Sequence, residues 1–201
     1  MKEYLVPTGD GEAQFIERRS RFIGHIFLTE TEEEALARLK QMREQYWDAT
    51  HNVYAYIIRD GATRFSDDGE PGGTAGMPVL QVLQREELYN VTCVVTRYFG
   101  GILLGTGGLV RAYQGSVKLG LEGLPVTLRE DMRRFVVSIE PHQVSDFQHF
   151  LAEARGRVQS SDFRFDATFE VLVPSDEADA FVERLSEATA GEALIDPIDE
   201  E

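Results

Sequence analysis

The side chains best suited to chemistry gather in residues 66–113, a stretch that holds half of the chain's 18 glycines. Its first segment, SDDGEPGGTAGMP, places the carboxylates of Asp67, Asp68 and Glu70 within four residues. Carboxylates this close repel one another unless something cationic lies between them. The cation could be Mg²⁺, an arginine or solvent ions alone, and the string lacks the acidic spacing and the closing glutamate of an EF-hand loop. The segment therefore predicts a place for a positive group.

The second segment, RYFGGILLGTGGLVRAY, has the order of an anion-binding loop. Residues 91–99 are β-branched and aromatic, which predicts a strand, and residues 109–121 carry an apolar side chain every four residues, which predicts a helix. A helix that follows glycines exposes free N–H groups and the positive end of its dipole, which favour a phosphate or a carboxylate. The candidate binding residues are Tyr98, Gly100, Gly101, Gly105, Gly107, Gly108 and Arg111.

The common nucleotide-binding motifs are incomplete in this loop. It lacks the last glycine of G-x-G-x-x-G, and the sequence contains no G-x-x-x-x-G-K-[ST]. Glycines also accumulate where a helix must pack closely on a sheet. Anion binding and close packing are therefore both open at this point.

Arg97 is the basic residue best placed to meet the acidic loop. In the predicted strand it shares a face with Val91, Cys93 and Val95, and an arginine on an apolar face is tolerated only when it is paired and hydrogen-bonded. We therefore expect Arg97 to contact Asp67 or Asp68. Such a contact would join the two glycine loops into one surface.

His51 stands at the entrance of a predicted strand, residues 52–59, and is a further candidate binding residue. It could act as a base or a ligand, although no H-x-x-H or C-x-x-C partner accompanies it. Tyr54 and Tyr56 alternate on one face of this strand. Unstacked bases bind to such a face, and aromatic side chains also pair there beneath a helix.

Arg18, Arg19 and Arg21 cluster where two predicted strands, residues 13–19 and 22–28, meet. Three arginines at a hairpin tip could contact phosphate. They could equally protect the edge of a sheet by their charge.

The elements that must position these residues predict an α+β protein of two domains. A capping box and an apolar stripe predict a helix at residues 31–46, and Pro78 begins a short helix that runs to about residue 88. Periodicity ends at residues 120–125, which places a boundary between domains at residues 1–123 and 130–201. In the second domain strand and helix patterns alternate in the order βαββαβ, a ferredoxin-like arrangement.

Composition and charge limit the class of protein and of partner. The chain has 201 residues, a net charge of −15 and one cysteine, Cys93, which we expect to be a buried thiol. The apolar runs are too short for a membrane span, and the first eleven residues have no apolar signal segment, so we expect a cytoplasmic protein. The negative charge argues against general binding of double-stranded DNA.

The segments DATHNVYAYII, FSDDGEPGGTAGMP and RYFGGILLGTGGLVRAY resemble the hallmark segments of the YigZ/IMPACT family, and RRSRFIGHI resembles its start. The likeness covers about residues 12–120, and a chain of this length resembles the bacterial branch. One departure is Met77, which stands where the bacterial pattern has a basic residue.

The resemblance implies a first domain with the βαβ superfold of ribosomal proteins and elongation factor G domain IV. It implies a second, ferredoxin-like domain, as in domain V of that factor. It also implies a link to translation, because the eukaryotic members are translational regulators that bind a partner of a stress-responsive kinase.

Three functions are compatible with the sequence. The first is a non-catalytic binding protein that engages RNA, the ribosome or a protein of the translation machinery through its glycine-rich domain, without a cofactor or resident metal. The alternative is an enzyme acting on a phosphorylated or carboxylated small molecule, with a metal in the acidic loop. The third is an adaptor in which the glycines serve only packing.

Overall fold

The computed structural model describes residues 3–59, 61–164 and 166–198, which form two compact units. The N-terminal unit is Tyr4–Leu128, and the C-terminal unit is Arg129–Glu201 together with Met1–Glu3. Each unit has its own hydrophobic core.

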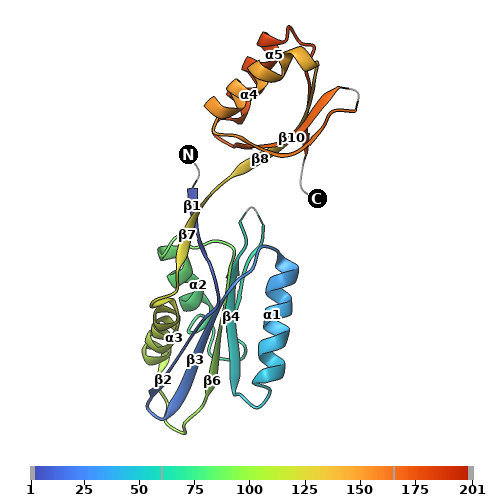
Figure 1. The fold of residues 1–201 in the computed structure, drawn as a ribbon. Coiled ribbons are helices and arrows are strands. Elements are labelled where there is room, and N and C mark those ends of the chain that lie inside the picture. The colour runs from blue at the N-terminus through green and yellow to red at the C-terminus, as the bar shows by residue number, and fades with distance from the viewer. Residues whose placement is uncertain (1–2, 60, 165, 199–201) are drawn as a thin grey trace. The chain divides into compact units, whose positions relative to one another are not determined.

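A five-stranded antiparallel sheet forms the middle of the N-terminal unit (Figure 1). Its strand order is β2-β3-β6-β4-β5, so β2 and β5 are the edge strands. The strands are β2 (Gly11–Glu17), β3 (Ser20–Leu28), β6 (Val91–Tyr98), β4 (His51–Ile57) and β5 (Thr63–Ser66).

Helices cover both faces of this sheet, with α1 on one side and α2 and α3 on the other (Figure 1). The helices are α1 (Glu32–Gln45), α2 (Gly76–Arg85) and α3 (Thr106–Leu121). The central strand β6 is buried on both faces, with Cys93 and Val95 toward α2 and α3 and Val94 toward α1. This explains its unbroken run of β-branched residues.

The sheet topology brings four loops together at one end of the N-terminal unit. Because β3 and β4 are both antiparallel to β6, the starts of β3 and β4 lie beside the end of β6, and the end of β5 lies beside β4. We call this end the loop end, and it comprises the Arg18–Arg19 turn and residues 46–50, 67–73 and 99–105. The candidate binding residues predicted from the sequence lie at the loop end or in the first turns of α3, except His51, Arg97 and Tyr98, which lie in the adjoining ends of β4 and β6.

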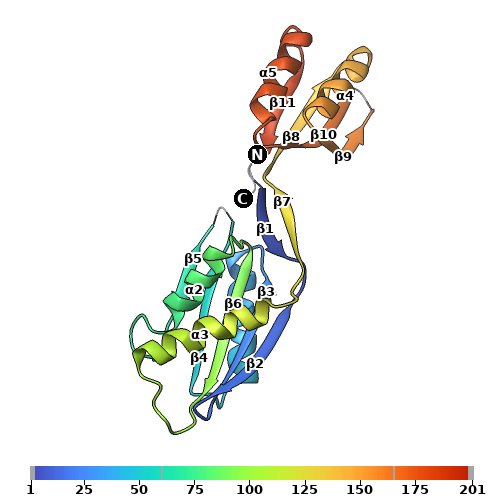
Figure 2. The same cartoon turned by 90° about the vertical axis from the view of Figure 1, so that its left-hand side faces the viewer.

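The C-terminal unit packs two helices on one face of a four-stranded antiparallel sheet of order β11-β8-β10-β9 (Figure 2). The elements follow the order β8 (Met132–Ile139), α4 (Val144–Glu153), β9 (Arg157–Asp162), β10 (Ala167–Pro174), α5 (Ala178–Ala188) and β11 (Leu194–Ile198). A short 3-10 turn, Pro141–Gln143, precedes α4. This is the predicted βαββαβ order.

The structure confirms the predicted α+β class with two domains. Three strands were not predicted. They are β5 and the pair β1 (Glu3–Pro7) and β7 (Val126–Glu130), which form a separate two-stranded sheet. Pro7 ends β1, and Pro125, in the predicted boundary at residues 120–125, comes just before β7.

Candidate functional site

Glu70 is the buried centre of the acidic loop. Its carboxylate accepts hydrogen bonds of 2.6 Å from the Arg97 guanidinium and 2.6 Å from the Tyr113 hydroxyl. The Arg97 and Glu70 side chains are 6% and 3% exposed. Burial, and then the hydrogen bond to Glu70, raise the pKa of Tyr113 far above its ordinary value, so this hydroxyl stays protonated as a donor.

The predicted contact of Arg97 with Asp67 or Asp68 is therefore wrong, because Arg97 pairs with Glu70. Asp67 instead accepts hydrogen bonds from the backbone N–H groups of Gly73, Ala75 and Gly76. Gly76 is the first residue of α2 and Ala75 is its N-cap, where the N–H groups of a helix lack partners within the helix, and Gly73 lies in the loop just before them. The Asp67 carboxylate thus takes the place that a bound anion would have at the backbone N–H groups of the first glycine loop.

Asp68 is held by a different part of the N-terminal unit. It accepts a 2.6 Å hydrogen bond from the backbone N–H of Asn52 and lies 3.5 Å from the Arg43 guanidinium. The three carboxylates of the acidic loop therefore have three separate sets of donors. Within the residues that the structure describes, no group of three or more His, Cys, Asp or Glu side chains could hold a metal ion.

His51 lies at the start of β4 against the acidic loop. Its Nδ1 is 2.8 Å from the carbonyl oxygen of Asp68, so Nδ1 donates and carries a proton. Its Nε2 lies 3.8 Å from the Glu70 carboxylate. Gly69 lies beside this contact with a φ of +87°, a left-handed backbone that favours glycine, whereas a Cβ there would make only ordinary contact with the imidazole ring at 3.6 Å. His51 thus mainly connects β4 to the acidic loop through these contacts.

The second glycine loop is tied to Arg97 through Ser20. The Ser20 hydroxyl oxygen accepts from Arg97 at 3.3 Å and from the backbone N–H of Gly100 at 3.2 Å. Arg97 therefore links the two glycine loops through Glu70 and Ser20, and not through the predicted contact with Asp67 or Asp68. Gly100 is required by close packing, because a Cβ there would lie 2.0 Å from the Arg19 carbonyl carbon.

Helix α3 starts at Thr106, three residues earlier than the apolar pattern predicts. Its N-cap is Gly105, with φ +72°, and no side chain caps the first turn. Gly107 and Gly108 lie in this turn, and Arg111 is exposed on the next one. The first N–H groups of α3 are therefore not capped by a side chain of the described residues, whereas the corresponding groups of α2 donate to Asp67.

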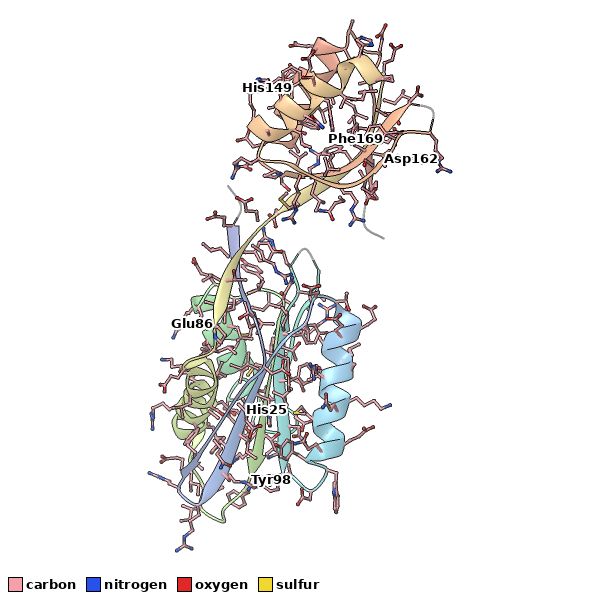
Figure 3. All side chains as sticks on the ribbon, in the orientation of Figure 1. His25, Glu86, Tyr98, His149, Asp162 and Phe169 are labelled. Carbon is pink, nitrogen blue, oxygen red and sulfur yellow. The ribbon has the colours of Figure 1, made fainter. Side chains whose placement is uncertain are left out.

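The loop end carries exposed apolar side chains that the sequence analysis did not select. Leu103 is 80% exposed and Trp47 82%, and Phe99 and Ile102 are also exposed. Tyr98, labelled in Figure 3, donates a hydrogen bond to Asp48 and lies under the Arg21 guanidinium at 4.4 Å. Burial, and then the bond to Asp48, raise the pKa of Tyr98.

Arg18 and Arg19 form the two-residue turn between β2 and β3. Both have left-handed backbones, with φ of 45° and 66°, as in the tight hairpin turns that usually contain Asn and Gly. Arg18 donates a 3.4 Å hydrogen bond to the Leu103 carbonyl oxygen. The turn therefore holds the exposed segment 99–105 while its arginines face solvent.

Two residues that hydrogen-bond the Arg97–Glu70 pair were not predicted as site residues, for the same reason. Tyr113 was assigned only to the apolar stripe of α3, and Ser20 was not selected at all. Their hydroxyl groups become important through contacts with residues more than forty positions away. The spacing of Tyr113 gives its face on the helix, but nothing in the sequence gives its partner.

The family comparisons cover parts of both units of the chain. The Impact N-terminal domain matches residues 18–121, and a domain of unknown function, DUF1949, matches residues 137–192. The chain belongs to the IMPACT family. An IMPACT family member from Bacillus subtilis, YvyE, is 38% identical over 197 residues, which cover 97% of this chain and 91% of that protein.

Two further matches differ in how much of this chain they cover. Protein IMPACT of Rattus norvegicus is 37% identical over 109 residues, which are 51% of this chain and 34% of the rat protein. A crystal structure described as that of a hypothetical protein covers all of both chains, at 33% identity and a TM-score of 0.69. The part shared with the rat protein is thus about half of this IMPACT family chain.

Other predictions concern the core and the membrane. Cys93 is fully buried, and burial raises the pKa of its thiol, so it behaves as a packed side chain. Met77, at the departure from the family pattern, packs partly buried against the core of the N-terminal unit. Among the described residues, the helices are too short or too polar to cross a bilayer.

Proposed function

We propose that this IMPACT family protein is a non-catalytic binding protein linked to translation. It uses the loop end to contact RNA, the ribosome or a protein of the translation machinery. The observation that carries the proposal is the group of exposed side chains there, Trp47, Phe99, Ile102 and Leu103, beside the arginines of the β2–β3 turn. Ile102 and Leu103 are neighbours in the chain, and Arg18 hydrogen-bonds the Leu103 carbonyl oxygen, so these exposed apolar side chains lie beside a charged turn, as at many binding surfaces.

The hydrogen bonds of the site favour binding over catalysis. Glu70 and Arg97 are buried and paired with each other, and Asp67 caps α2. A general base or nucleophile has to reach a substrate atom within hydrogen-bond distance. These groups hold the loops in place instead, and the groups that remain accessible are apolar side chains, arginines and glycine backbone.

The uneven distribution of charge between the two units determines which unit an anionic partner would contact. Residues 1–128 contain 13 Lys and Arg against 17 Asp and Glu, a net charge of −4, whereas residues 129–201 contain 7 against 18, a net charge of −11. A polyanion would therefore approach the N-terminal unit, and its arginine turn in particular, while the C-terminal unit repels it.

The link to translation comes from the family. The Impact N-terminal domain matches residues 18–121, and 109 residues of the chain are 37% identical to the rat IMPACT protein. Because the Impact N-terminal domain match contains the whole loop end, the loop end is the surface through which a common partner class would be bound.

A co-sedimentation experiment tests the proposal. Wild-type protein and an Ile102→Ser/Leu103→Ser variant are added to gently lysed cells, and ribosomal fractions are separated on sucrose gradients at low and moderate salt. Leu194→Ser is the control, because Leu194 is 66% exposed in the C-terminal unit. We expect the wild type and the control to travel with ribosomal fractions or a translation factor, and the double variant to be lost from them. Equal behaviour of all three proteins would refute the role of the loop end.

A further inference from the structure

A groove of about 400 Å³ runs between β2 and α3, on the side of the N-terminal unit where both views place these elements next to each other (Figures 1 and 2). Phe15 and Leu104 contribute apolar surface to it. On the helix side the lining residues Gly108, Ala112 and Gly115 are small, so α3 leaves the groove open there. A Cβ on Gly115 would meet no atom within 4 Å, so no packing inside the unit requires a glycine there.

The strand beside this groove has a free edge. β2 is the terminal strand of its sheet and pairs only with β3 among the described strands. The two-residue turn closes the hairpin at the pair Glu17–Ser20, and hydrogen-bonded pairs alternate from there along an antiparallel ladder. The backbone N–H and C=O groups of Glu12, Gln14 and Ile16 therefore point away from β3. No backbone hydrogen bond reaches them from another described loop or strand.

The groove also has an excess of positive charge in a chain whose net charge is −15. Arg18, Arg111 and Lys118 line it, against Glu17 and Glu122. Neither Arg111 nor Lys118 forms an ion pair with any residue that the structure describes. Both side chains are exposed and able to receive a carboxylate.

We propose that an extended acidic peptide segment of a partner protein binds here by adding a strand to the free edge of β2. Its backbone pairs with Glu12, Gln14 and Ile16, and every second side chain enters the groove toward α3. Apolar side chains of the peptide cover Phe15 and the small residues of α3, and its carboxylates meet Arg111 and Lys118. This inference goes beyond the proposed function of the loop end and does not depend on that function, although Arg18 and Leu104 belong to both surfaces.

The free edge selects a peptide over a nucleic acid. Basic side chains alone would suit RNA equally well, because they recognise phosphate and carboxylate alike. Alternating backbone donors and acceptors along a strand edge match another polypeptide strand, whereas a phosphate chain offers only acceptors. The small residues of α3 next to that edge leave room for the side chains of the added strand.

Two pairs of variants test the groove and the edge separately. Gly115→Leu fills the groove from the helix, and Gly115→Ala is its control, because alanine fits the open space and favours the helix. Gln14→Pro removes an edge N–H that the sheet does not use, and Gln14→Ala keeps it. Thermal melting checks that each variant folds. Gly115→Leu alone still tests the groove if the proline unfolds the strand.

The probe is a phage-displayed library of random heptapeptides, selected on the immobilised full chain. Recovered peptides are synthesised with a fluorescent label and titrated by anisotropy. We expect peptides that alternate apolar residues with Asp or Glu. Their affinity should fall about tenfold or more in Gly115→Leu and Gln14→Pro and change less than about twofold in the alanine controls. Arg111→Glu should also weaken binding.

Three outcomes would overturn the proposal. One is a selection that recovers no peptide, or peptides that bind Gly115→Leu as well as the wild type. Another is a concentration-dependent dimer that Gln14→Pro abolishes, because the edge would then be occupied by a second copy of the chain. The third is binding of an oligouridine probe that requires Arg111 and Lys118 but not the Gln14 N–H. Ile102→Ser/Leu103→Ser should retain peptide binding, which separates this test from that of the loop end.

Discussion

Arg97 and Glu70 form an ion pair of 2.6 Å between side chains that are almost completely buried. The pair links β6 to the acidic loop, and Tyr113 of α3 adds a second hydrogen bond to the same carboxylate oxygen. Three elements that are far apart in the sequence therefore meet at one charged atom.

Removal of Arg97 should strongly destabilise the N-terminal unit. In Arg97→Met the Glu70 carboxylate stays buried with Tyr113 as its main donor, and an uncompensated buried charge costs about 3–5 kcal/mol. Urea unfolding followed by circular dichroism measures the change in the free energy of unfolding.

The double variant Arg97→Met/Glu70→Gln is the matched control. Because it removes both charges, it should lose less stability than the sum of the two single variants. A loss below about 1 kcal/mol in Arg97→Met would contradict a buried, mutually dependent pair.

Gly100 should tolerate no side chain. A Cβ at this position would lie 2.0 Å from the carbonyl carbon of Arg19 and 2.1 Å from its oxygen. Backbone atoms of a tight turn cannot move aside as a flexible side chain can, so Gly100→Ala should cost about 2 kcal/mol or more and loosen the second loop. Thermal unfolding measures this cost.

Gly72 provides the comparison for Gly100. A Cβ at Gly72 would meet nothing within 4 Å, and Gly72→Ala should change stability by less than about 0.5 kcal/mol. Similar losses in the two variants would mean that glycine matters in these loops for flexibility and not for close packing.

The two glycine loops show what a sequence can and cannot predict about a site. The strand before Gly100 and the helix after it follow from local patterns, and so does the burial of Arg97 on an apolar face. The acid that Arg97 meets does not follow. Asp67, Asp68 and Glu70 look equivalent in the sequence, and the turn geometry of the loop decides which of them points inward.

The surface residues were harder to predict than the buried ones. Trp47 and Leu103 look like core residues by type, and only the fold shows them exposed at the loop end. Likewise, the sequence predicts that β2 is a strand, but it is the strand order that makes β2 an edge. Properties that depend on the neighbours of an element, and not on the element itself, are the ones that required the structure.

His25 should make the stability of the N-terminal unit depend on pH. The side chain, labelled in Figure 3, is buried, and its Nε2 has no hydrogen-bond partner among the described residues. Burial lowers its pKa below the ordinary value of 6.5, and the Glu12 carboxylate, 3.5 Å from Nδ1, only partly opposes this shift. The unfolded chain therefore binds a proton more readily than the folded one. The contribution of neutral His25 is full above about pH 6.5 and decreases as the pH falls toward the folded pKa.

The variant His25→Phe isolates this contribution. Phenylalanine keeps a ring beside Tyr46 and Phe27, which lie 5.2 and 6.1 Å from the His25 ring, and removes the titrating group. Urea midpoints of both proteins between pH 5 and 8 should show a smaller loss of stability on acidification in the variant. If the two pH profiles are parallel, His25 is protonated as easily in the folded protein as in the unfolded chain, and burial does not control its charge.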